Sequence, residues 1–420
     1  MLTVREISRI IIRESFRILR NQIKGAAVIK ELPEPIRIPA VPGGQSNVGF
    51  VIGRDELIKK LWEDSESSSI LLTDIRRLGK SSVLSKMAAE TNRESKCIKI
   101  SLQGVDTTTK LCETIIKDLY TFQTLSKRVL STLKEFFTFE VSAGPVKIAL
   151  KQAYKYDPLA TLETALIEIS KVLNEEKRFL LLACDEVPDM LLSIKDKEGP
   201  DEARKTLAIL RRLRENNPSL CWILTGSVGM HHVMSQIGAG DDLTNDLIYY
   251  ELGALEASWA KYLADCLLRG NDVKYDPDTS TEIVRITDGI PYLEHLVVAY
   301  ARDQKETLGG NNVASLFDRA AADLDVSHQS TSLLTRLDRY YNPDDCLLAG
   351  SILDELAQHG PNKRPTLQEA LSCTNGQPEK NLKRIVDLLI RDHYLKRTPD
   401  GDISWKYRSL ARIWEIRRAS

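Results

Sequence analysis

The sequence predicts an α/β fold, in which a core with a mainly parallel sheet is followed by an all-helical domain and a small module of helices and a two-stranded ribbon. Short apolar runs alternate with helix-length segments, which is typical of a parallel sheet with helices on both faces. These runs occupy residues 70–73, 97–102, 179–184 and 221–225. Residues 251 to about 335 have helical periodicity without strands. The last 80 or so contain three helical segments and then a ribbon that turns at Asp400-Gly401.

The chain of 420 residues is too long for one core, so we expect two or three compact domains. A basic helix with a Pro-rich linker, the sheet domain, the helical domain and the terminal module are expected at residues 1–45, 46–250, 251–335 and 336–420. Within the sheet domain, residues 137–152 alternate around Ala143-Gly144-Pro145, which predicts a hairpin insertion.

The first expected helix spans residues 4–27 and carries its basic side chains along one side, with apolar residues between them. Such a helix either docks on a partner, a membrane or DNA, or packs on its own domain. Residues 31–44 are rich in Pro and Gly and predict a linker.

The composition is that of a globular protein, with 42% apolar and 28% charged residues. The net charge of −1 gives no general indication of nucleic-acid or membrane binding. No apolar run approaches the roughly 20 residues needed to span a bilayer, and no secretory signal opens the chain, so we expect a cytoplasmic protein. The seven cysteines contain no CxxC pair and predict reduced thiols. The adjacent histidines His231-His232 have no metal-like spacing to a further ligand.

The most informative segment is the Gly-Lys-Ser loop, residues Thr73–Ser82, which reads TDIRRLGKSS between an apolar run and a helical segment. A strand, a turn ending in Gly79-Lys80-Ser81 and a helix together form a phosphate cradle, in which Lys80 reaches the β- and γ-phosphates and Ser81 contacts Mg²⁺. Asp74 stands where the motif has its first glycine. Its negative charge could be offset by Arg76 and Arg77. The alternative is a surface turn that happens to contain Gly-Lys-Ser.

The segment RFLLLACDEVPDML, residues 178–191, supplies the second half of the expected site. Asp185 and Glu186 stand at the carboxyl end of its apolar strand, the edge of an open α/β sheet where ligands bind. Asp185 would hold Mg²⁺ through a water. Glu186 would act as the general base that polarises the attacking water.

Two further groups are candidates for catalysis. Thr225 and Ser227 end the next strand and could hydrogen-bond the attacking water or the γ-phosphate, or form an ordinary turn. Arg211, Arg212 and Arg214 end a helix, from which an arginine could reach a neighbouring subunit's γ-phosphate, or simply face solvent.

Five segments stand in a recognisable order: Gly49–Arg54, Arg76–Ser82, Asp185–Pro188, Thr225-Gly226-Ser227 and Gly289-Ile290-Pro291. In these motifs the chain resembles AAA+-like P-loop ATPases of the STAND type, in particular the bacterial and archaeal ATPases whose core is followed by a winged helix. The resemblance covers roughly residues 48–420 and implies a P-loop NTPase core, an all-α lid, a winged-helix domain, ATP or ADP, and Mg²⁺. The expected nucleotide-binding residues are Phe50, Val51, Gly53, Arg54, Asp74, Arg76, Arg77, Leu78, Gly79, Lys80, Ser81, Ser82 and Pro291. The departure at Asp74 predicts weak ATPase activity.

The winged helix has two interpretations. The basic side chains of its third helix (378–391) and its ribbon would meet duplex DNA; they are Lys380, Lys383, Arg384, Lys396, Arg397, Lys406 and Arg408. Residues 340–420 nevertheless hold 13 Lys+Arg against 11 Asp+Glu, a difference of only +2. The resemblance also implies an internal clamp that holds the inactive state.

Three functions follow from these observations. The first is an ATP-dependent switch whose nucleotide state changes the domain arrangement and controls self-association or a protein partner. The second is a DNA-associated ATPase that resembles origin-recognition initiators or transposition regulators. The third is a nucleotide-binding scaffold in which Asp74 has abolished turnover.

Overall fold

The structure is a computed structural model that describes residues 32–44, 47–91, 95–121, 126–140, 147–151, 157–226, 229–323, 337, 339–375 and 379–419. The chain divides into two compact units, Met1–Ile36 and Arg37–Ser420. The helix predicted over residues 4–27 lies outside the described residues. Among the described helices, none has the length and apolar character required to cross a bilayer.

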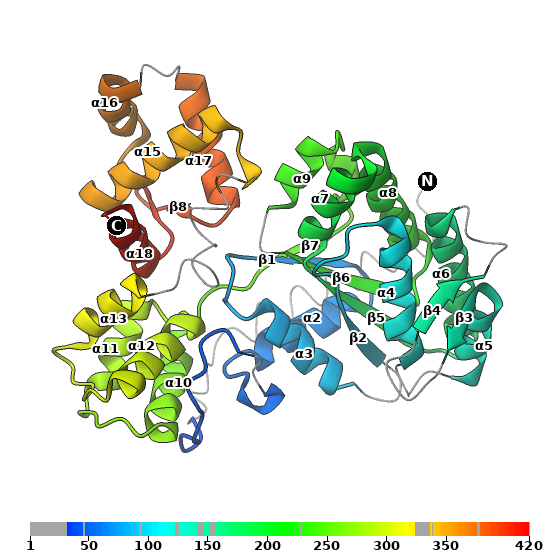
Figure 1. Cartoon of the computed structure of the whole chain (residues 1–420), viewed down its shortest axis with the longest axis horizontal. Helices are drawn as coiled ribbons and strands as arrows, with labels where there is room; N and C mark the ends of the chain where they lie inside the picture. Colours follow the sequence, from blue (N-terminus) through cyan, green and yellow to red (C-terminus); the bar gives the residue numbers. More distant parts are fainter. Residues whose placement is uncertain are drawn as a thin grey trace, which may run out of the picture. The chain divides into compact units, whose positions relative to one another are not determined.

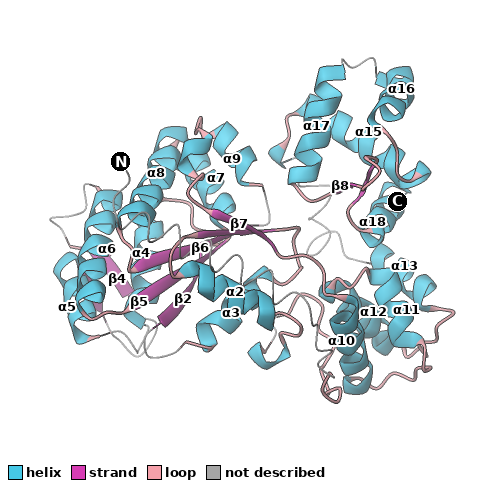
Figure 2. Ribbon diagram, turned by 180° about the vertical axis from the view of Figure 1, so that it is seen from behind, coloured by secondary structure: helices cyan, strands magenta, loops and turns pink. Residues whose placement is uncertain are grey.

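A five-stranded parallel sheet forms the centre of the second unit, in the order β2-β5-β6-β1-β7 (Figure 2). Its strands are β1 Ile70–Thr73, β2 Ser95–Ser101, β5 Phe179–Asp185, β6 Leu220–Gly226 and β7 Ile248–Glu251. The four strands expected from apolar runs are confirmed. The prediction missed β7, because IYYE at the sheet edge alternates between half-buried and exposed residues and is not an apolar run.

Helices cover both faces of this sheet, as predicted (Figures 1 and 2). Alternate strand residues belong to two separate hydrophobic clusters: Leu181 and Ala183 pack in one, and Leu180 and Leu182 in the other. The first cluster includes residues of α2 Asp55–Ser65 and α3 Lys80–Ala89. The second includes residues of α4 Thr108–Thr121, α6 Pro158–Glu175, α7 Val187–Glu198, α8 Pro200–Asn216 and α9 Met230–Gln236. Two short 3-10 turns lie at Val48–Phe50 and Asp241–Leu243.

The predicted hairpin insertion is present. Helix α5 (Lys127–Phe136) leads into β3 Phe137–Glu140, which pairs antiparallel with β4 Lys147–Leu150. The turn around Ala143-Gly144-Pro145 lies outside the described residues.

After the sheet domain come four helices, namely α10 Ala257–Gly270, α11 Thr279–Thr287, α12 Pro291–Gln304 and α13 Val313–Ala322. They occupy the region predicted to be an all-helical lid, and residues 252–323 contain no strand, only one isolated bridge between Tyr275 and Leu308.

The C-terminal module begins at α15 and has the predicted order of three helices and a ribbon. Its elements are α15 Pro343–His359, α16 Arg364–Asn375, α17 Glu379–Arg391, β8 Leu395–Arg397, β9 Ile403–Trp405 and α18 Arg408–Ala419. Helix α18 was not predicted, and Arg408, expected in the ribbon, begins it. The domain boundaries given above remain predictions.

Candidate nucleotide site

The Gly-Lys-Ser loop leaves β1 at Thr73 and enters α3 at Lys80. Gly79 stands at the N-cap of α3 with φ 102°, a backbone angle that favours glycine, and gives the helix no side-chain cap. Arg77 also has a positive φ of 71°. Alternating backbone of this kind turns successive N–H groups toward one point, and the positive end of the helix favours an anion there. The loop therefore has the backbone of a phosphate cradle.

The Lys80 side chain is buried beneath this loop. Its Nζ donates to the carbonyl oxygens of Asp74 at 2.7 Å and of Ile75 at 2.8 Å. These bonds hold the ammonium against the first half of the loop, and their acceptors are neutral. The geometry fits the phosphate role predicted for Lys80.

Asp74 is almost fully buried, with 1% of its surface exposed. Its carboxylate accepts from the backbone N–H of Ile75 at 2.7 Å and from that of Gly253 at 2.8 Å. The Lys406 ammonium of the C-terminal module lies 3.1 Å from Asp74 Oδ1 and 2.5 Å from Glu251 Oε1. Lys406 thus forms the ion pair that compensates Asp74, a role that the sequence had suggested for Arg76 and Arg77.

His393 joins the same network from the end of α17. Its Nε2 lies 3.1 Å from Thr73 Oγ1, and its Nδ1 lies 3.3 Å from Lys406 Nζ and 3.6 Å from Glu251 Oε2. The carboxyl ends of β1 and β7 therefore meet two side chains of the C-terminal module. His393 was not predicted as a site residue, and Lys406 was predicted to meet DNA. The latter prediction is wrong, because the Lys406 side chain is 12% exposed and faces the Gly-Lys-Ser loop.

The expected metal ligands lie close together on the other side of the loop. Asp185 ends β5, and its Oδ1 accepts a hydrogen bond of 2.6 Å from Thr225 at the end of β6. Lys99 of β2 donates to the Ser81 carbonyl at 3.0 Å and lies 3.9 Å from Asp185 Oδ2. One ammonium thus bridges Ser81 and Asp185. Lys99 was not predicted as a site residue, although a lysine inside the apolar run CIKISL is a signal that could have found it.

Glu186 follows Asp185 at the N-cap of α7, with φ 63° and ψ 42°. The left-handed region is costly for a residue with a Cβ, and such strain often accompanies functional side chains. The carboxylate is half-buried. Its position beside Asp185 suits a general base. Ser227, which was predicted with Thr225 to contact the attacking water or the γ-phosphate, lies outside the described residues.

The segment before the loop connects to the lid. Arg54 is buried and donates to the carbonyls of Leu252 at 3.1 Å and Gly253 at 2.8 Å. Burial lowers the pKa of its guanidinium to about 10. A Cβ on Gly53, which has φ 67°, would stand 2.7 Å from Trp259 Cβ of α10. Phe50 packs against the core cluster that contains α3, and Val51 is buried.

Arg77 links the Gly-Lys-Ser loop to the start of α12. Its guanidinium carbon lies 4.4 Å from the centroid of the Tyr292 ring, next to Pro291 at the first turn of that helix. Within the described part of the chain, Arg77 Nε and Nη1 are buried and lack a hydrogen-bond acceptor. Buried donors are normally satisfied, so an anionic or carbonyl-bearing ligand fits here.

The other predicted loop residues are exposed Arg76, fully buried Leu78 and half-buried Ser82.

The three arginines at the end of α8 bind carboxylates of this chain. Arg211 pairs with Glu215 at 2.7 Å, Arg212 with Glu163 at 2.8 Å and Arg214 with Asp246 at 2.7 Å. The Arg214 side chain is 1% exposed and is structural. Arg211 and Arg212 remain candidates only if they can exchange these partners.

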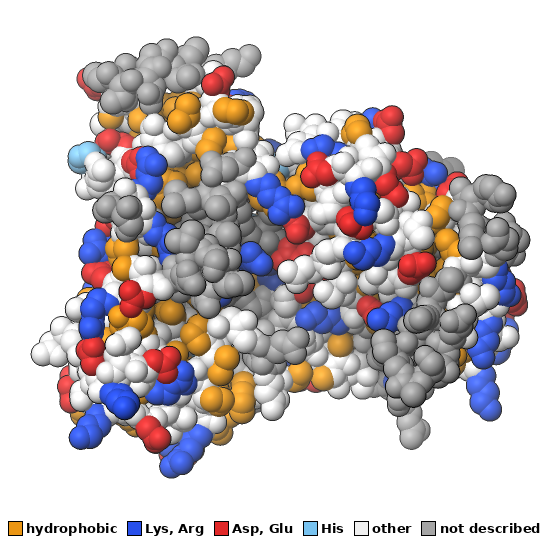
Figure 3. Space-filling model, in the orientation of Figure 1, with side chains coloured by type: hydrophobic (Ala, Val, Ile, Leu, Met, Phe, Trp, Pro, Cys, Tyr) orange, Lys and Arg blue, Asp and Glu red, His pale blue; other side chains and the backbone are white. Residues whose placement is uncertain are grey.

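The side chains proposed for DNA are also partly engaged. Arg384 binds Asp345, with one contact of 2.8 Å, and Arg397 binds Asp387 at 2.8 Å. Lys383 and Lys396 are exposed. The side chain of Lys380 is not among those that the structure describes. Basic and acidic side chains are interspersed over the face shown in Figure 3.

No protein-family model and no curated protein sequence matches this chain. Its structure is similar to the Walker-type ATPase PABY2304 of Pyrococcus abyssi, with a TM-score of 0.61 and 18% identity over 87% of this chain and 96% of that one. It is also similar to the ORC2 protein of Aeropyrum pernix in its ADPNP–ADP complexes, with a TM-score of 0.53 and 12% identity over 93% and 98%. The chain shares the α/β fold of these two proteins, with its mainly parallel sheet. At these identities the likeness shows the fold alone.

Proposed function

We propose that the protein is a Mg²⁺-dependent ATP-binding switch that hydrolyses ATP slowly and reports its nucleotide state through the C-terminal module. The observation that carries this proposal is the Gly-Lys-Ser loop itself. One end of it forms a phosphate cradle at Gly79 and Lys80, and the other end holds Lys406 of the C-terminal module through Asp74.

The site residues divide the binding work among them. Lys80 and the first N–H groups of α3 bind phosphate, Ser81 and Asp185 hold Mg²⁺, and the segment from Phe50 to Arg54 with Pro291 frames the base. Bound Mg²⁺–ATP supplies an electrophilic γ-phosphorus. Glu186 takes the proton from water, and Thr225 orients Asp185 through its 2.6 Å bond. The names of the two similar structures, an ATPase and a protein bound to adenine nucleotides, agree with these roles.

The C-terminal module acts as an internal clamp in this proposal. Its order of three helices and a two-stranded ribbon supports the predicted winged helix. Lys406 and His393 reach the carboxyl ends of β1 and β7, next to the proposed phosphate cradle. Release of these two side chains would free the module for self-association or a protein partner. Light scattering with and without ATP tests that output, and an unchanged mass would count against assembly.

DNA binding is the second candidate, because Lys383 of α17 and Lys396 of β8 are exposed on the elements that a winged helix uses. Fluorescence anisotropy with duplex DNA at two salt concentrations tests it. Binding that weakens with salt and with Lys383→Ala supports the candidate. Absence of binding at low salt eliminates it.

The direct test of nucleotide binding is a titration with fluorescent ADP and ATP in the presence of Mg²⁺. Lys80→Ala removes a charged donor and is expected to weaken binding roughly 10- to 100-fold. Lys86→Ala is the matched control, because Lys86 lies on the same helix and pairs with Asp55 at 2.5 Å. Equal affinities of the wild type and Lys80→Ala would show that this lysine does not bind phosphate.

A further inference from the structure

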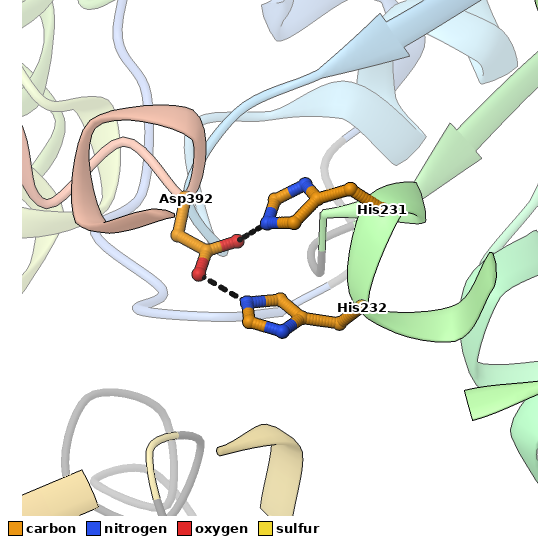
Figure 4. A group of neighbouring side chains, drawn as sticks. All are labelled: His231, His232 and Asp392. Atoms are coloured by element: carbon orange, nitrogen blue, oxygen red, sulfur yellow. Dashed lines mark hydrogen bonds and ion pairs between the residues drawn. The ribbon is translucent and has the colours of Figure 1, made fainter. Parts of the chain in front are cut away.

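A second polar cluster lies away from the Gly-Lys-Ser loop, where α9 meets the end of α17. It consists of His231 and His232 on α9 and Asp392, which directly follows α17 (Figure 4). The pair of histidines and the aspartate are about 160 positions apart in the chain. One nitrogen or oxygen atom of each residue lies within 4.8 Å of the others.

The three side chains converge on one point. His232 Nε2 lies 2.6 Å from Asp392 Oδ2, and His231 Nε2 lies 3.5 Å from Asp392 Oδ1. The Tyr341 hydroxyl donates to Asp392 Oδ2 at 2.6 Å, which fixes the carboxylate. Both imidazoles present the same nitrogen type, with ring centroids 4.3 Å apart.

Two atoms in the cluster are unsatisfied. Within the described residues, His231 Nε2 and Asp392 Oδ1 are buried and make no hydrogen bond. Their separation of 3.5 Å is too long for a good one. The Asp392 side chain is only 8% exposed, so solvent does not readily satisfy it. A buried carboxylate oxygen and an imidazole nitrogen that face each other unbonded are a favourable arrangement for a cation between them.

Gly229 keeps this space open. Its φ of −60° and ψ of 123° are available to any residue, so its backbone does not require glycine. A Cβ at this position, however, would stand 2.2 Å from a His231 ring carbon and 2.6 Å from Asp392 Oδ1. The absence of a side chain at residue 229 is what lets the histidine and the carboxylate approach.

The described part of the chain contains one other group with a similar composition, Asp74, Glu251 and His393. The ammonium of Lys406 already lies among these side chains, 3.1 Å from Asp74 and 2.5 Å from Glu251. The ammonium of Lys406 therefore already neutralises the carboxylates of that group. Among the described residues, the His231–His232–Asp392 cluster is the one suited to an external cation.

We propose that His231, His232 and Asp392 bind a divalent transition metal, with Zn²⁺ as the favoured ion. Two imidazoles and a carboxylate are a common Zn²⁺ ligand set, completed by water or another ligand in the fourth position. Tyr341 orients the carboxylate from outside the ligand set. Ligands about 2 Å from the metal lie somewhat more than 3 Å apart in tetrahedral geometry. The 3.5 Å pair is close to this spacing, and the 2.6 Å pair lengthens on binding.

Such a site joins α9 of the sheet domain to the end of α17, one residue from His393. Metal binding would thus stabilise the contact between the C-terminal module and the sheet domain. This role is separate from nucleotide chemistry, since no member of the cluster belongs to the proposed nucleotide site.

The test is metal titration of the full chain after dialysis against a chelator. Co²⁺ gives a visible absorption that reports tetrahedral binding, and Zn²⁺ affinity follows by competition. We expect one equivalent to bind in the wild type, with loss of that site in His231→Gln and Gly229→Ala. Tyr341→Phe is expected to weaken binding about 10- to 100-fold.

One histidine variant is a control. His359→Gln removes a surface histidine near Glu355 and should still bind one equivalent of metal. Circular dichroism verifies that each variant folds. If Gly229→Ala does not fold, the metal uptake of His231→Gln alone tests the proposal. No uptake by the wild type, or equal uptake by His231→Gln, overturns the proposal. Fluorescent ADP binding, measured in parallel, separates this failure from a failure of the nucleotide site.

Discussion

The two ends of the Gly-Lys-Ser loop, the early end at Thr73-Asp74 and the late end at Gly79-Lys80-Ser81, have partners from different parts of the chain. At the late end, Gly79, Lys80 and Ser81 form the start of α3 and act through local backbone geometry. At the early end, Thr73 and Asp74 contact His393 and Lys406, which lie 320 and 332 positions further along the chain. The geometry of the proposed phosphate cradle depends on neighbouring residues in the sequence, whereas the contact with the C-terminal module depends on distant parts of the fold.

The largest expected effect separates chemistry from binding at the late end. Glu186→Gln keeps the shape of the side chain but cannot accept a proton, so the steady-state rate of phosphate release should fall about 10²- to 10⁴-fold. Fluorescent ATP affinity should stay near that of the wild type. A wild-type rate that is measurable and unchanged in the variant would remove Glu186 from the mechanism. An inactive wild type that binds ATP would favour the scaffold interpretation.

The next effect concerns the early end. Lys406→Met removes the cation beside Asp74, whose side chain is fully buried, and should lower the free energy of unfolding by about 3 kcal/mol. Denaturant unfolding measures this change. Arg397→Met is a suitable control, since it breaks the exposed pair with Asp387 and should cost about 0–1 kcal/mol. Equal costs for the two variants would show that the buried pair has no special role.

A third effect provides a reference in the lid, outside the early-end network. Burial raises the pKa of fully buried Glu294, so the folded state keeps a proton that the unfolded state loses above its ordinary pKa. Stability should therefore fall as pH rises above the ordinary glutamic acid pKa of 4.5, by up to about 1.4 kcal/mol per pH unit. Glu294→Gln should remove this slope in unfolding experiments at several pH values. A slope that is unchanged in the variant would assign it to other groups.

The smallest expected effect compares the loss of the Asp74 charge with the loss of its partner Lys406. Asp74→Asn removes the negative charge, yet Lys406 keeps Glu251 at 2.5 Å, so the cost should be only about 1 kcal/mol. The Asn side chain has a single acceptor oxygen, so either the Ile75 or the Gly253 N–H group loses its acceptor, and nucleotide release should accelerate. A loss as large as that of Lys406→Met would mean that Glu251 does not support the lysine.

The sequence predicted the features that depend on local order. The apolar runs located four strands. Gly79-Lys80-Ser81 fell at the start of a helix and Asp185-Glu186 at the end of a strand, as predicted. The features that it missed depend on long-range contacts or on an edge. Lys406 and His393 reach the Gly-Lys-Ser loop only through the fold, Asp392 joins the two histidines from α17, and β7 lacks an apolar run. Lys99 was visible as a lysine within a strand, but its bridge between Ser81 and Asp185 was not.

The most direct test of the clamp is a double-mutant cycle between Asp74 and Lys406, read as the dissociation rate of fluorescent ADP. We expect Asp74→Asn and Lys406→Met each to accelerate release, and the double variant to release no faster than Lys406→Met, with a coupling energy of about 0.5–3 kcal/mol. Rates that multiply independently, or that match the wild type in both single variants, would contradict a clamp that acts through this contact.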